Sequence, residues 1–174
     1  MMTRRTVAVF VVIMMFVLSL SGVILASEYT IRLAYEDPPN LQTAPEHAFG
    51  VLFKDLVETA SNGRIEVLLF PGGTLGRSIA LTEMVQSGNI EAAITTGVIG
   101  NFFPPFEVIY IPYLFPNEYV AWQVIDGPFM AGLFEEMRKQ TGLRVLGVSQ
   151  NGTRHFTNNV RPIRSPNDLK GLKM

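Results

Sequence analysis

Apolar and polar residues alternate along residues 29–35, so that Ile31 and Leu33 share one face. This alternation is the pattern of a β-strand. Residues 65–70 instead form a nearly continuous apolar run, which is typical of a strand buried on both faces of a parallel sheet. The sequence therefore predicts two strands of one buried sheet.

Between these strands, apolar residues recur at helical spacing over residues 43–60 and stop at Asn62-Gly63. Thr43 and Glu46 stand at capping-box spacing, and Pro45 falls in the first turn. We therefore expect a helix whose first turn is capped by Thr43. Strand, helix and strand of these lengths form a βαβ unit with a right-handed crossover.

Helices and strands continue to alternate further along the chain. Helices are predicted over residues 78–87, 117–125 and 128–140, and strands over residues 91–96 and 143–149. Repeated units of this kind favour an α/β fold with a mainly parallel sheet.

Two loops interrupt this alternation. Residues 71–76 are rich in glycine but match neither nucleotide-binding motif, so we interpret them as a structural turn rather than a phosphate site. Residues 102–113, the aromatic segment, combine large rings with prolines that cannot donate the hydrogen bonds of a central strand. We expect this segment to form a cleft wall or to pack near a hinge.

The chain becomes polar and basic from Asn151 onward, and residues 165–171 resemble a turn that leads into a short helix. Residues 171–174 resemble the opening of a strand, and a strand without a partner is an unusual terminus. We therefore expect a fragment with lobe one over residues 27–150 and the start of a truncated lobe two over residues 151–174.

The first 26 residues have the pattern of a secretory signal peptide. Arg4 and Arg5 precede an apolar run from Val7 to Leu25, and Ala26 is a suitable last residue before cleavage. An uncleaved anchor helix is the alternative, because this run approaches the ~20 residues that span a bilayer. In both cases we expect a periplasmic location for the rest of the chain.

Composition excludes several classes of function. There are no cysteines and two histidines among 174 residues, which removes disulfides, thiol catalysis and cysteine zinc sites. A net charge of −1 gives no electrostatic footprint for nucleic acid. We therefore expect no metal, no cofactor and no nucleic-acid partner.

Charge is unevenly distributed along the chain. Residues 27–137 hold four basic and fourteen acidic side chains, whereas residues 138–174 hold eight basic side chains and one acidic side chain. A basic region of this kind is either a solvated face or a surface that receives an anionic ligand.

Arg154 is a candidate ligand contact because it follows a predicted strand end and a glycine near the predicted boundary between lobes. Ligands of α/β folds bind beyond the carboxyl ends of strands and at domain interfaces, and a guanidinium binds a carboxylate through two parallel hydrogen bonds. Ser149, His155 and Asp168 would be the members of a hydrolase triad, but no G-x-S-x-G motif surrounds the serine. We therefore interpret Ser149, His155 and Asp168 as polar surface residues.

Several motifs spread over the chain after residue 26 point to one family. They are Phe49 to Ile65, Phe70-Pro71 with Leu75-Gly76, Ile111-Pro112-Tyr113-Leu114-Phe115, Asn151-Gly152-Thr153-Arg154, and Arg161-Pro162-Ile163 with Ser165-Pro166-Asn167-Asp168-Leu169-Lys170-Gly171-Leu172-Lys173. Together they resemble the extracytoplasmic solute receptors of TRAP transporters, the DctP type. The last motif is fairly specific to this family.

The resemblance implies a two-lobed receptor of the Venus flytrap kind. Such a protein captures an organic acid outside the inner membrane, delivers it to the permease subunits of a TRAP transporter and is not an enzyme. The alternatives are a periplasmic sensor module for a signalling receptor and a secreted α/β hydrolase that uses Ser149 and His155.

The resemblance also implies four ligand-binding residues: Arg154, Asn151, Glu36 and Thr96. Arg154, in the motif that begins at Asn151, falls on a position that contacts the ligand carboxylate. Glu36 ends the first strand at a position that can face the cleft, and Thr96 lies where some members carry a glutamate. The principal carboxylate-binding arginine of the family would follow Met174.

Overall fold

The computed structural model describes residues 27–150, 152 and 156–173. The chain divides into two compact units: unit 1 ends at Arg144, and unit 2 begins at Val145. The predicted signal peptide at residues 1–26 lies outside the described residues. The lobe boundary predicted at residue 150 stays a prediction.

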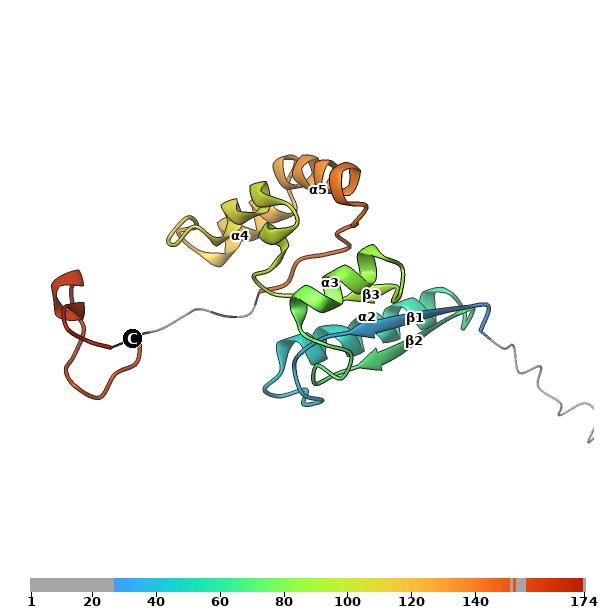
Figure 1. Cartoon of the computed structure of the whole chain (residues 1–174), viewed down its shortest axis with the longest axis horizontal. Coiled ribbons are helices and arrows are strands. Elements are labelled where there is room, and N and C mark those ends of the chain that lie inside the picture. The colour runs from blue at the N-terminus through green and yellow to red at the C-terminus, as the bar shows by residue number, and fades with distance from the viewer. Residues whose placement is uncertain (1–26, 151, 153–155, 174) are drawn as a thin grey trace, which may run out of the picture. The chain divides into compact units, whose positions relative to one another are not determined.

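Unit 1 is built on a parallel sheet of three strands, in the order β2-β1-β3. These strands are β1 (Tyr29–Ala34), β2 (Ile65–Phe70) and β3 (Ala92–Ala93). Helix α2 (Pro45–Ala60) connects β1 to β2, and helix α3 (Ser78–Gln86) connects β2 to β3 (Figure 1). The predicted α/β fold with a parallel sheet is therefore confirmed.

Each face of the sheet packs against a different helix because successive strand side chains point to opposite faces. Leu33, Tyr35 and Val67 form one buried cluster, which includes Phe53 and Val57 of α2. The opposite face contributes a second cluster, whose buried members are Ala34, Leu81 and Ile90. A helix therefore lies on each face of the sheet, but the second strand is not buried on both faces as predicted, because Glu66 and Leu68 are exposed and Val67 is its one fully buried residue.

A glycine allows α2 to approach the sheet closely. A Cβ atom added to Gly50 would lie 3.1 Å from the ring of Tyr35. The ring is fully buried, and its hydroxyl lies 2.7 Å from Nδ1 of His47 on the same helix. A larger side chain at position 50 would therefore force the helix and the tyrosine ring apart.

Side-chain carboxylates accept hydrogen bonds from backbone N–H groups of the sheet that have no neighbouring strand to bond. The N–H of Arg32 donates to Glu91 at 2.8 Å, one residue before the start of β3, and the Arg32 guanidinium makes two further bonds with the same carboxylate. At the free edge of β2, the N–H of Val67 donates to Glu58 at 2.9 Å, while Lys54 donates to the Val67 carbonyl at 2.7 Å. These contacts cover an edge that would otherwise be open to another strand.

The remaining elements of unit 1 are helices. The 3₁₀ helix η1 (Ile99–Asn101) precedes the aromatic segment, and a second 3₁₀ helix, η2 (Pro104–Tyr110), lies within it. As its prolines predicted, the segment is not a central strand. Helices α4 (Glu118–Ile125) and α5 (Pro128–Thr141) follow and pack against each other (Figure 1).

Helix α4 is capped at its start and helix α5 at its end. The Asn117 side chain accepts a hydrogen bond of 3.0 Å from Val120, which satisfies one free N–H of the first turn of α4. Gly142 ends α5 in the left-handed conformation that a C-terminal glycine favours.

Three predictions about elements were wrong in detail. Strand β3 has two residues, because Glu91 uses its side chain rather than its backbone to bond β1. Residues 143–149 form no strand, since no neighbouring strand pairs with them within the described residues. The Thr43 capping box is absent: Ala44 is the N-cap, and the Glu46 carboxylate bonds backbone N–H groups of residues 36 and 37 instead.

Unit 2 contains the predicted short helix, η3 (Pro166–Leu169). The Asp168 carboxylate accepts hydrogen bonds from the N–H groups of Arg164 and Ser165 and from the Ser165 hydroxyl. These bonds lower the pKa of Asp168. Within the part of the chain that the structure describes, no helix is both long and apolar enough to cross a membrane.

We expect Leu81→Ala to lower the free energy of unfolding by about 2–5 kcal/mol, because it leaves a cavity at a fully buried position. Leu52→Ala is the control: this leucine is 57% exposed on α2, so its loss should change stability by about 0.5 kcal/mol or less. Urea unfolding of both variants measures the difference. Equal losses would contradict the packing of α3 on the sheet.

Acid should remove the stabilisation that Glu91 provides. Its pKa is lowered to about 2, chiefly by the hydrogen bond from Arg32. A carboxyl group with a depressed folded pKa stabilises the native state above its ordinary pKa of 4.5 and loses this effect as the pH falls towards 2. Solvent limits the effect, since both side chains are about 40% exposed.

Thermal unfolding at several pH values tests this expectation with Glu91→Gln, which should lack the part of the acid dependence that falls between pH 4.5 and pH 2. Glu66→Gln is the matched control, because Glu66 is an exposed carboxylate of β2 that accepts a hydrogen bond from Ser27. Parallel pH profiles for wild type and Glu91→Gln would show that the Arg32 contact does not stabilise the fold.

Candidate ligand-binding site

The carboxyl ends of the three strands lie at one edge of the sheet, where parallel α/β folds bind their ligands. Ala34 pairs with both Phe70 and Ala93, which brings the strand ends into register. The N–H of Ile94 extends this register by donating to Ala34 at 2.9 Å. The segments that follow the strands, residues 35–37, 71–73 and 94–97, therefore meet at this carboxyl edge.

Glu36, predicted as a ligand contact, lies at the carboxyl edge directly after the last buried residue of the β1 segment. Its Oε1 accepts hydrogen bonds from the Ser78 hydroxyl at 2.5 Å and from the Ser78 N–H at 2.6 Å. These two bonds, with a smaller contribution from the Arg77 charge, lower the pKa of Glu36. The carboxylate is thus held in its ionised form at the N-terminus of α3, where the helix dipole favours negative charge.

Glu46 lies beside this group but is much less accessible, with 7% of its surface exposed. Burial raises the pKa of Glu46, and the hydrogen bonds that it accepts from the N–H groups of Asp37 and Glu36 act in the opposite direction. Among the described residues, no set of three histidines or carboxylates is arranged to hold a metal ion. The acidic residues of this edge are therefore held by backbone and hydroxyl donors.

The glycine-rich loop closes the carboxyl edge on the β2 side. Gly72 and Gly73 have φ values of 70° and 64°, a conformation that side chains disfavour. Their N–H groups donate to Asp37 at 2.8 Å and to Tyr35 at 3.0 Å. This loop is the structural turn that the sequence predicted, and these two N–H groups are used within the protein.

Thr96, the second predicted contact, is exposed three residues beyond the end of β3. The neighbouring Gly97 donates its N–H to the hydroxyl of Tyr110 at 3.1 Å. This bond brings one ring of the aromatic segment to the carboxyl edge. Glu36 and Thr96 thus follow adjacent strands at one edge, and their roles as ligand contacts stay predictions.

Arg154 and Asn151, the other two predicted contacts, lie outside the described residues, as does His155. Their roles stay predictions. The third member of the hydrolase alternative, Asp168, uses its carboxylate to cap η3. This capping role matches the interpretation of Asp168 as a polar surface residue.

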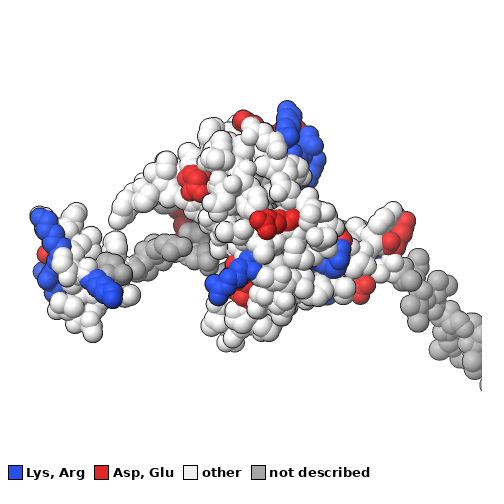
Figure 2. All heavy atoms as spheres, viewed as in Figure 1, with Lys and Arg blue, Asp and Glu red and all other residues white. Residues whose placement is uncertain are grey.

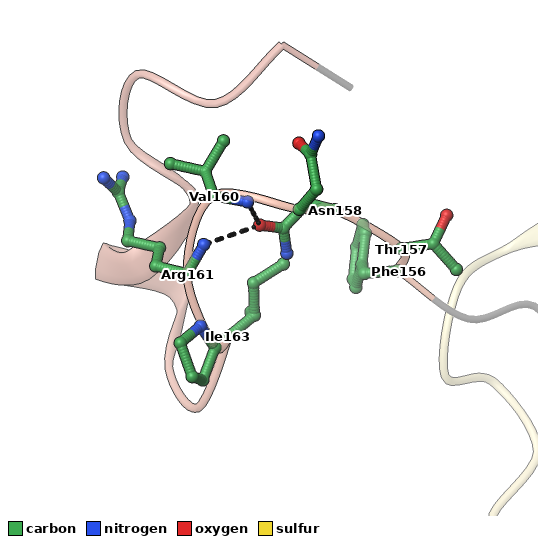
Figure 3. A pocket seen from close by; sticks show the side chains of 8 residues that line it. Phe156, Thr157, Asn158, Val160, Arg161 and Ile163 are labelled. Carbon is green, nitrogen blue, oxygen red and sulfur yellow. Dashed lines mark hydrogen bonds between the residues drawn. The ribbon is translucent and has the colours of Figure 1, made fainter.

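An open hollow of about 790 Å³ lies within unit 2 and is lined by residues 156–163 (Figure 3). Its loop is shaped by Asn158, whose Oδ1 accepts N–H bonds from Val160 and Arg161 at 3.0 Å each. Every lining residue comes from one stretch of chain, and the Phe156 side chain is 59% exposed. Because one loop cannot enclose a ligand on several sides, we place the candidate site at the carboxyl edge instead.

Arg138, Lys139 and Arg144 of the predicted basic region lie in unit 1, but basic side chains still outnumber acidic ones in unit 2. Figure 2 shows them on the surface of this unit, where the described residues include four basic side chains and one acidic side chain. Arg161 is partly used within the unit, because its guanidinium donates to the carbonyls of Asp168 and Lys170. Some of this positive charge is therefore structural.

Two residues of the site were missed in the sequence. Ser78 was assigned only to a helix start, although hydroxyl residues and carboxylates are both favoured at helix N-termini. Glu46 was assigned to a capping box with Thr43, three residues away, whereas its carboxylate bonds segments nine and ten residues away. Spacing along one helix could not reveal either long-range contact.

Comparison with known proteins places this architecture in a family. The family model described as bacterial extracellular solute-binding protein, family 7 (DctP) matches residues 40–174. A solute-binding protein of Verminephrobacter eiseniae is 34% identical over 153 residues, 86% of this chain and 44% of the relative. The 2,3-diketo-L-gulonate-binding periplasmic protein of Escherichia coli K12 is 31% identical over 146 residues, with 83% and 43% covered.

A solved structure shares the fold. The TRAP periplasmic solute-binding protein of Haemophilus influenzae with bound L-gulonate has a TM-score of 0.70 and 29% identity, with 83% of this chain and 46% of that chain covered. The two-lobed fold class is therefore that of its solved relatives. The chain spans about half the length of the relatives that it matches. It belongs to family 7 of the bacterial extracellular solute-binding proteins, the DctP family.

Proposed function

We propose that this chain is part of an extracytoplasmic receptor that captures an organic acid and delivers it to the permease subunits of a TRAP transporter. The observation that carries the proposal is the family match over residues 40–174, on a unit whose strand ends meet at one polar edge. The periplasmic names of the relatives support a location outside the inner membrane. The predicted signal peptide at residues 1–26 would direct export.

The relatives indicate which acids to consider. One is named for 2,3-diketo-L-gulonate, and another was solved with L-gulonate. Both acids carry one carboxylate and a chain of oxygen substituents. We propose a sugar acid or a similar hydroxylated carboxylate as the ligand of this protein.

The residues of the site fit such a ligand in separate roles. Glu36 is an ionised hydrogen-bond acceptor and suits a hydroxyl donor, while the exposed hydroxyl of Thr96 can donate or accept. Arg154 would bind the carboxylate through its guanidinium, and Asn151 would add an amide beside it.

Binding and release, rather than bond making, is the function that these residues support. Glu36 accepts its hydrogen bonds from Ser78 at the start of α3, and Asp168 accepts its bonds as the cap of η3, so each carboxylate is used to hold the start of a helix. A receptor of this kind gains affinity when a closing cleft excludes water and adds contacts from a second lobe.

The ligand class can be tested by thermal unfolding of the mature protein as its gene encodes it. Probes are L-gulonate, 2,3-diketo-L-gulonate, sialic acid, C4-dicarboxylates and 2-oxoacids. A ligand at 100 times its Kd should stabilise the native state by about 2.7 kcal/mol. Stabilisation by none of these acids would contradict the proposal.

Arg154→Ala should weaken binding of the best acid by a factor of about 30 or more, because losing one partner of a buried charge pair leaves the ligand carboxylate unpaired. Isothermal calorimetry measures this change. Arg144→Ala is the control, since Arg144 is exposed outside the site and should leave the affinity unchanged. An affinity of Arg154→Ala within threefold of wild type would remove Arg154 from the site.

A further inference from the structure

Glu46 joins the start of α2 to the segment that follows β1. Its Oε2 accepts hydrogen bonds from the N–H groups of Glu36 and Asp37, both at 3.0 Å. Its own N–H donates in return to Oδ2 of Asp37 at 3.1 Å. These three hydrogen bonds form a ring that joins the first turn of α2 to residues 36 and 37, which lie nine to ten residues earlier in the sequence.

The ring forms because strand pairing ends at this point. The N–H of Tyr35 still donates to Phe70 at 3.2 Å, but the next two N–H groups are beyond the ladder. Buried backbone donors need an acceptor, and a carboxylate is a strong one. Glu46 therefore continues the hydrogen bonding of β1 for two residues past the strand end.

The two residues that flank Glu36 are fixed by the glycine turn. Gly73 donates to the carbonyl of Tyr35, and Gly72 donates to the carbonyl of Asp37. Glu36 thus has an anchored neighbour on each side and an N–H anchored on Glu46.

The Glu36 side chain is anchored through one oxygen. Both of its hydrogen bonds, from the hydroxyl and the N–H of Ser78, fall on Oε1. Within the described residues, Oε2 is therefore available to a donor on a ligand. Its position depends on the backbone of residue 36 and on the start of α3.

We propose that Glu46 is a positioning residue, which acts through the backbone of Glu36 and Asp37 to hold Glu36 Oε2 in place for a ligand hydroxyl. The inference rests on the proposed function, because the donor would belong to the bound acid. Glu46 itself is buried, so it acts on the ligand only through Glu36. A shift of the backbone at residue 36 would break the alignment with Ser78 as well as with the ligand.

Glu58 provides a matched control on the same helix. Its carboxylate also accepts a backbone N–H from the sheet, that of Val67 at 2.9 Å, and it pairs with Lys54. It lies in the last turn of α2, whereas Glu46 lies in the first. Both residues secure the helix to the sheet, but Glu46 alone of the two bonds the residues at the carboxyl edge.

The test uses four variants of the mature protein as its gene encodes it: Glu46→Gln, Glu46→Asp, Glu58→Gln and Glu58→Asp. Glu46→Gln keeps the length of the side chain and an oxygen acceptor, so it should preserve positioning. Glu46→Asp keeps the charge but is one methylene shorter and should fail to reach both N–H groups. The readouts are the pKa of the Glu36 carboxyl by NMR and the affinity for L-gulonate by calorimetry.

We expect Glu46→Asp to raise the pKa of Glu36 towards its ordinary value and to weaken L-gulonate binding about tenfold, a change of 1.4 kcal/mol. Glu46→Gln should retain both properties. The Glu58 variants should lower the melting temperature without changing either readout, which separates positioning from stability.

Two results would overturn the inference. One is an unchanged Glu36 pKa in Glu46→Asp, and the other is an equal effect of Glu58→Asp on that pKa. The NMR readout needs no ligand, so failure of wild type to bind any tested acid would contradict the proposed function separately.

Discussion

The fold of unit 1 depends on satisfying the backbone hydrogen bonds of a small parallel sheet at its margins. Three strands, one of them two residues long, leave N–H groups without strand partners. Carboxylates supply the missing acceptors: Glu91 bonds Arg32, Glu58 bonds Val67, and Glu46 bonds the two residues after Tyr35. Each joins the sheet to a neighbouring segment, so the acidic composition of this region has a structural cause.

The same requirement shapes the candidate site. Polar groups gather at the carboxyl edge because strand pairing ends there, and Glu46 and the glycine turn then fix the backbone around Glu36. Ser78 holds the Glu36 carboxylate in its ionised form at the N-terminus of α3. Because the backbone of this edge is already fixed, a ligand that binds there spends less free energy on ordering the protein.

Local pattern predicted most elements of unit 1 because apolar periodicity reflects which face each element buries. Short-range caps, such as Asn117 on α4 and the Ser165–Asp168 pair, were also within reach of the sequence. Long-range partners were not: the strand expected at residues 143–149 lacks a pairing strand, and Glu46 bonds a distant loop rather than Thr43. All four predicted site residues came from the family resemblance, and Arg154 was also predicted from its place after a strand end; the structure places Glu36 and Thr96 after β1 and β3.

Amide hydrogen exchange measures directly whether carboxylates complete the backbone hydrogen bonding of the sheet. The N–H groups of Arg32, Glu36, Asp37 and Val67 have side-chain carboxylates in place of strand partners. We expect these four amides to exchange as slowly as the paired amides inside β1, because each opens only when the sheet itself opens. Exchange at the rate of exposed loop amides would show that the carboxylates do not complete the hydrogen bonding of the sheet.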